Sequence, residues 1–181
     1  DPLAGMIADP AELEAQARHE LDLVLAGVDE SGLAGQVEPT LVRDDPAKAL
    51  LDAAKGADLL VVGGPTHAFG MSRPRTRSSA AEQVSTGLVS TGAGLREWVE
   101  KLECSPTTGT AAFDTRVNKP RLPGTASHAA EKRLRRRGCT IAARGTSFLV
   151  DGMTGPLLPG EEDRARRWGE SVAATVVAQP V

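Results

Sequence analysis

Residues 57–63 read Ala-Asp-Leu-Leu-Val-Val-Gly and are followed directly by Gly64 and Pro65. A short apolar run that ends in glycine and proline is typical of a parallel strand buried on both faces. Just before it, Asp45 and Pro46 open a run rich in alanine and leucine that ends at Gly56. Aspartate and proline favour a helix start and glycine favours a helix end, so this stretch predicts a helix over residues 46–55 leading into a strand over 57–63.

Alternating helical and extended patterns continue outward from this strand. Helices are expected over residues 11–26, 92–103, 127–137 and 161–177. Strands are expected over residues 37–42, 110–116 and, as one interrupted strand, 139–143 and 147–150, and a long polar loop over 65–91. Strict alternation predicts a parallel sheet with helices on both faces, a three-layer α/β/α sandwich formed by one domain over residues 1–181.

The composition of the chain limits the classes of protein and of binding partner that we expect. Hydrophobic residues make up 40% of the chain, which argues against disorder, and the net charge of −3 gives no reason to expect nucleic acid or a membrane as a partner. No apolar run approaches the ~20 residues of a membrane span, so a cytoplasmic location is expected. Cys104 and Cys139 lie far apart without metal-site spacing, so we expect two reduced thiols.

The first third of the chain resembles the universal stress protein family. The resemblance rests on residues 37–63, VEPTLVRDDPAKALLDAAKGADLLVVG, extends over about residues 13–63, and marks residues 1–57 as a stress-protein-like segment. It implies an adenine-nucleotide-binding module. The family's nucleotide signature places a glycine three residues after Gly64, where this chain has His67.

The rest of the chain resembles flavodoxin-like proteins. The matching segments come in the family's order: DLLVVGGPTHAFGMSRPRTR, STGAGLREWVEKL, TAAFDTRV and SFLVDGMTGPLLPGEEDRARRWGESVA. The resemblance covers about residues 58–177 and marks 58–181 as a flavodoxin-like segment. It implies a doubly wound parallel sheet, a flavin mononucleotide (FMN) cofactor, and electron transfer rather than bond-making catalysis.

The resemblance also implies a ring site at the carboxyl ends of two strands, where ligands of open α/β sheets bind. It puts one group of residues on one side of the flavin ring, namely Pro65, Thr66, His67 and Phe69. It puts a second group on the other side, namely Asp114, Thr115 and Arg116. No catalytic residue and no metal site are expected. The family's phosphate loop is not found, since residues 24–32 do not match it.

Several alternatives stay open. The expected ligand is a flavin or a nucleotide, the expected protein partner is a redox partner, and a homodimer is a further alternative. The change of resemblance near residue 58 also fits a natural recombinant, an engineered chimera or a truncated chain, including a scaffold that binds no ligand. Two basic stretches have simpler interpretations as solvated surface: the loop with Arg73, Arg75 and Arg77, and the helix end at residues 132–137.

Overall fold

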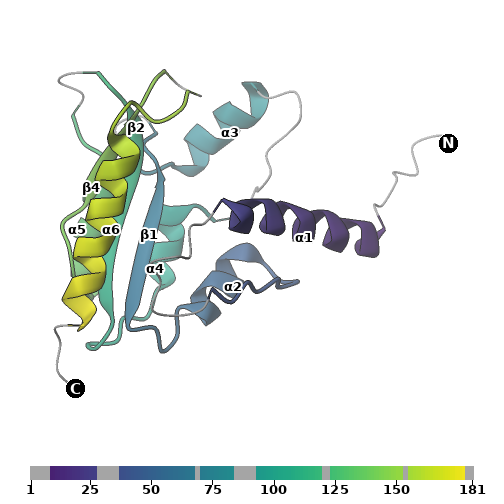
Figure 1. Ribbon diagram of the computed structural model, residues 1–181, viewed down its shortest axis with the longest axis horizontal. Coiled ribbons are helices and arrows are strands. Elements are labelled where there is room, and N and C mark those ends of the chain that lie inside the picture. The colour runs from purple at the N-terminus through teal and green to yellow at the C-terminus, as the bar shows by residue number, and fades with distance from the viewer. Residues whose placement is uncertain are drawn as a thin grey trace. The chain divides into compact units, whose positions relative to one another are not determined.

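The computed structural model describes residues 9–27, 37–67, 70–83, 93–119, 123–152 and 155–177 (Figure 1). The chain divides into two compact units, Asp1–Asp44 and Asp45–Val181, which we describe separately. The division falls before residue 57, where the sequence resemblance changes. The single domain expected from the sequence stays a prediction.

The first unit contains one helix, α1 (Pro10–Ala26), in its described part. The carboxylate of Asp9 accepts a hydrogen bond from the backbone N–H of Ala11 at 3.0 Å, the usual role of an N-cap aspartate. Glu14 forms an ion pair with Arg43. The strand expected over residues 37–42 is wrong, because residues 37–44 form no strand. Pro39 has no N–H to give to a ladder, and this disfavours a strand there.

The second unit is built on a sheet of parallel strands. Its strands are β1 (Leu59–Pro65), β2 (Gly109–Val117), β3 (Thr140–Ile141) and β4 (Thr146–Val150). β1 pairs along one side of β2, and β3 and β4 pair in turn with the start and the end of β2 on its other side. The expected parallel α/β sheet and its interrupted last strand are therefore confirmed.

The helices of this unit are α2 (Pro46–Ala53), α3 (Pro74–Gln83), α4 (Leu95–Lys101), α5 (Ala126–Arg136) and α6 (Glu161–Val177). The continuous loop expected over residues 65–91 is wrong, because helix α3 forms within this range. Its start is stabilised locally, because the backbone N–H of Arg73 donates to the Thr76 hydroxyl at 2.8 Å and Pro74 suits a first helical position.

The core lies between the sheet and helices α4 and α5. Val62 of β1 and Ala112 of β2 pack with Val99 of α4 and Leu134 of α5, and all four side chains are buried. The indole Nε1 of Trp98 donates to the backbone carbonyl of Ala47 at 3.1 Å, which ties α2 to this core. No helix in the described ranges is both long and apolar enough to cross a membrane.

The opposite face of the sheet is covered unevenly. Neighbouring residues of a strand point to opposite faces, so Phe113 lies on the side away from Ala112. Its ring packs at 6.1 Å from that of Phe148 and at 5.9 Å from that of Trp168 on α6. Val61 on β1 is 42% exposed, so this cover does not reach β1 fully, and the unit is an open parallel sheet with helices.

The two cysteines do not form the free thiols expected from the sequence. Cys104, just after α4, forms a disulfide with Cys139, which follows α5. Helices α4 and α5 pack against each other, so their carboxyl ends bring together two residues that are 35 positions apart. The expectation of reduced thiols is therefore wrong for this structure.

Candidate functional site

The loops after β1 and β2 lie side by side at the carboxyl edge of the sheet. Pro65 and Thr115 are paired residues of the two strands. The backbone N–H of Thr66 then donates to the carbonyl of Thr115 at 2.8 Å, which continues the contact past the end of β1. Two groups of predicted site residues, 50 positions apart, therefore meet where parallel α/β sheets bind ligands.

The side chains of these residues differ in exposure. Pro65 and His67 are exposed, and Thr66, Thr115 and Arg116 are half-buried. His67 exchanges two backbone hydrogen bonds with Gly70, at 2.7 and 3.0 Å, which fix the chain just after β1. Phe69, the remaining predicted residue of this loop, lies outside the described residues.

Two of the predicted site residues cap helix α5. The Thr66 hydroxyl accepts a hydrogen bond from the N–H of Ala126 at 2.8 Å, and Asp114 Oδ2 accepts one from Ser127 at 2.6 Å. Thr125, the N-cap residue, accepts the third from His128 at 3.1 Å. The first three N–H groups of α5 thus have protein acceptors, so they are not available to a phosphate group.

Asp114 is fully buried, at 0% exposure, beneath the start of α5. Among the described residues, neither its Oδ1 nor the buried Nε of Arg116 has a hydrogen-bond partner. A carboxylate at a helix N-terminus is favoured by the helix dipole. Asp114 is therefore placed to position α5 against the sheet, whereas Arg116 keeps an unused donor at the same edge.

Alternation along β2 divides the second group of predicted residues between two faces of the sheet. Asp114 and Arg116 lie on the face of Ala112, toward α5, and Thr115 lies on the face of Phe113. Thr115 is also paired in register with Phe148 of β4. A ligand at this edge would therefore contact Thr115 and Arg116 from different sides.

A buried carboxylate further along α5 supports the loop between β3 and β4. Glu131 Oε2 accepts a hydrogen bond from the backbone N–H of Gly145 at 2.7 Å, and its Oε1 accepts one from Arg135 at 3.0 Å. The Gly145 hydrogen bond, followed by Arg135, holds the pKa of Glu131 below its usual value against the opposing effect of burial. Glu131 is therefore a structural carboxylate.

The apolar cleft of about 500 Å³ in this unit lies away from these residues. It is bounded by α2, β1 and the start of α4, and its wall includes Leu50, Val61 and Trp98. Among the described residues, no charged side chain lines it, so they offer it no group for acid–base or phosphate chemistry. Within the described ranges, no three histidine, cysteine or acidic side chains gather in a way that would hold a metal ion.

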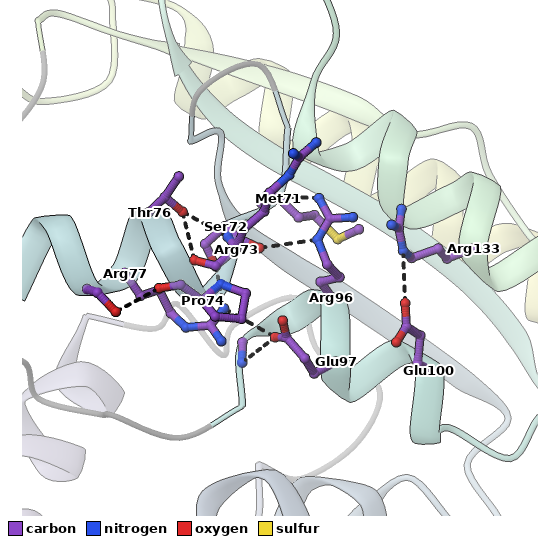
Figure 2. Close-up of polar contacts among 12 residues, drawn as sticks. Met71, Ser72, Arg73, Pro74, Thr76, Arg77, Arg96, Glu97, Glu100 and Arg133 are labelled. Atoms are coloured by element: carbon purple, nitrogen blue, oxygen red, sulfur yellow. Dashed lines mark hydrogen bonds and ion pairs between the residues drawn. The ribbon is translucent and has the colours of Figure 1, made fainter.

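No pattern in the sequence indicates one further feature, a group of arginines that packing brings together. Of the arginines in the expected loop, Arg77 pairs with Glu97 of α4 at 3.2 Å, whereas Arg73 and Arg75 are exposed. Arg73 instead lies near Arg96 of α4, which also lies near Arg133 of α5 (Figure 2). No sequence spacing relates these three positions, because packing of three separate elements brings them together.

Comparison of the chain with protein-family models, with curated proteins and with solved structures finds no match. The function must therefore be argued from the geometry of the carboxyl edge itself.

Proposed function

We propose that the chain is a flavodoxin-like FMN-binding electron-transfer domain whose flavin ring lies at the carboxyl edge of the parallel sheet. The observation that carries the proposal is the hydrogen bond from the Thr66 N–H to the Thr115 carbonyl, at 2.8 Å. It joins the two loops to which the sequence resemblance assigns the ring. A complete three-layer, doubly wound α/β/α sandwich is part of the same proposal.

The residues at this edge fit a flavin ring in part. Pro65 and His67 offer exposed surface for one side of a planar ring, the side to which the sequence resemblance also assigns Phe69. The Nε of Arg116, which has no hydrogen-bond partner within the described part of the chain, offers a donor to a polar ring edge. When bound, the flavin would supply the redox chemistry, and the protein would orient the ring and set its surroundings.

Two residues of the predicted site have a different role in this proposal. Thr66 and Asp114 accept hydrogen bonds from the start of α5, so they position the loops rather than contact the ring. Because those N–H groups are already used, the start of α5 does not fit the flavin phosphate. The phosphate must then be held elsewhere, or the domain must bind the flavin ring without it.

The proposal keeps the other sequence-based expectations. A redox partner protein and a homodimer are proposed partners, and the proposed location is cytoplasmic. The Cys104–Cys139 disulfide bears on this location, because structural disulfides persist mainly in oxidising compartments. The oxidation state of these cysteines in protein from cells would therefore test the proposed location.

The test is an absorbance scan of the purified chain mixed with FMN and then desalted. We expect retained flavin bands, and we expect His67→Ala and Arg116→Gln to weaken binding roughly tenfold each. Arg75→Gln, which removes an exposed arginine from α3, is the matched control and should bind as the parent does.

Two outcomes would overturn the proposal. Absence of retained flavin at high protein concentration would leave a scaffold without this ligand. A thermal shift with ATP and none with FMN would favour the adenine-nucleotide-binding module that the first segment resembles.

A further inference from the structure

Three arginine side chains from separate elements gather on one side of the second unit. Arg73 immediately precedes α3, Arg96 lies in the first turn of α4, and Arg133 lies on α5. Figure 2 shows the guanidinium group of Arg96 beside Met71, between those of Arg73 and Arg133. Burial, followed by the charges of Arg133 and Arg73, lowers the pKa of Arg96, which agrees with this proximity.

Arg96 is held in place by main-chain acceptors rather than by a carboxylate. Its Nε donates to the carbonyl of Ser72 at 3.3 Å and its Nη2 donates to that of Met71 at 3.1 Å. These acceptors are neutral, so the positive charge of Arg96 is not cancelled. A guanidinium fixed in this way keeps its remaining N–H groups aimed in a defined direction.

Nearby carboxylates do not balance the three positive charges. Glu97 is engaged with Arg77 at 3.2 Å and with the N–H of Gly94 at 2.9 Å. Glu100 lies 3.6 Å from Arg133 and is 60% exposed, so this pair is loose. Among the described residues, Arg73 and Arg96 form no ion pair, so three guanidinium groups face one carboxylate and leave an excess of two positive charges.

A gathering of like charges is costly unless an anion joins it. Unit charges of the same sign repel strongly where the surroundings are partly buried, and Arg96 and Arg133 are both half-buried. Guanidinium groups bind tetrahedral oxyanions through paired N–H donors. A dianion would cancel the excess charge of this group, whereas a chloride ion would cancel half of it.

We propose that Arg73, Arg96 and Arg133 form a binding site for the dianionic phosphate of a phosphate monoester. Arg96 is the fixed element, and Arg73 and Arg133 close on the anion from the start of α3 and from α5. The site lies outside the carboxyl-edge residues, so it stands whether or not the chain binds a flavin ring.

The test is a calorimetric titration of the full chain with phenyl phosphate in about 0.1 M NaCl, where long-range attraction is screened beyond about 10 Å. We expect saturable binding of one equivalent. Arg73→Gln and Arg133→Gln should each weaken it roughly tenfold, since each removes charge-assisted hydrogen bonds. Arg75→Gln, two residues from Arg73, should leave the affinity within a factor of two.

The outcomes separate this site from the proposed flavin site. No saturable binding, or an equal loss in Arg75→Gln, would overturn the inference, because the attraction would then be absent or unspecific. Arg133→Lys adds a second check. If this variant binds phenyl phosphate as tightly as the parent does, recognition by the paired N–H donors of a guanidinium group is contradicted. Arg96 is left unchanged because it also holds the main chain at Met71 and Ser72.

Competition with flavins identifies the source of the phosphate. Displacement of phenyl phosphate by FMN but not by riboflavin would support the site and assign it to the flavin phosphate. Retained phenyl phosphate in the presence of FMN would support the site with another monoester as its ligand. Riboflavin binding without phenyl phosphate binding would overturn this site and leave the ring proposal standing.

Discussion

The buried carboxylate of Asp114 on β2 accepts a hydrogen bond from the backbone N–H of Ser127, with 2.6 Å between Oδ2 and the nitrogen. With Thr66, which directly follows β1, it fixes the start of α5 to the ends of both strands at the edge proposed to bind the ligand. The same contact therefore helps to hold the carboxyl edge of the sheet in place.

Removal of this acceptor should destabilise the second unit. Asp114→Ala leaves the Ser127 N–H without its partner in a buried place, so we expect a loss of about 1–3 kcal/mol in the free energy of unfolding. Urea denaturation would measure it. Asp114→Asn keeps an acceptor oxygen and should lose about half as much or less. Equal losses in the two variants would contradict a specific role for the hydrogen bond.

Gly63 is required by the ring of Phe113. A Cβ atom at position 63 would lie 2.2 Å from two carbons of this ring, which is itself packed between Phe148 and Trp168. Gly63→Ala should therefore cost about 1–3 kcal/mol of stability through overpacking. Gly64→Ala is the matched control, because its Cβ would meet Leu95 at 3.9 Å, an ordinary contact. Comparison of thermal midpoints tests the difference, and equal midpoints would count against it.

The disulfide between Cys104 and Cys139 closes a loop across β2 and α5. A cross-link of 35 residues restricts the unfolded chain, and its removal should lower the free energy of unfolding by about 3–4 kcal/mol. Urea denaturation of the parent and of the Cys104→Ser, Cys139→Ser double variant would measure this. The parent should show two reactive thiols only after reduction and unfolding. Two thiols in the unreduced, unfolded parent would refute the bond.

Glu131 should make the free energy of unfolding of the second unit depend on pH. Its folded-state pKa is lowered by the Gly145 N–H and by Arg135, so its contribution is present above the unfolded-state pKa of about 4.3 and is lost as the pH falls through the folded value. Glu131→Gln should therefore be less stable than the parent by about 1 kcal/mol at neutral pH, and the gap should close in acid. Glu170→Gln, which removes an exposed carboxylate, is the control. If the difference in stability between the parent and Glu131→Gln grows as the pH falls, the folded-state pKa of Glu131 is not lowered and the prediction is wrong.

Local patterns predicted the elements of the second unit well. The strand expected over residues 57–63 is β1 (Leu59–Pro65), and the expected helix before it is α2 (Pro46–Ala53). Each rests on a nearby signal, such as Asp45, whose carboxylate accepts the Lys48 N–H at 3.0 Å. Residues 37–42 had a similar extended pattern and form no strand, because a strand also needs a neighbour to pair with.

The parallel α/β character of the sheet follows from the sequence alone, because buried apolar runs that alternate with capped helices favour this class of fold. Which side chains come into contact depends on the tertiary structure: Thr66 and Asp114 at the start of α5, Cys104 with Cys139, and Arg96 near Arg73 and Arg133. Caps and periodicity act within a few residues and can be read along the chain. These contacts join positions tens of residues apart. They depend on how helices and strands pack, and no local sequence pattern specifies that packing.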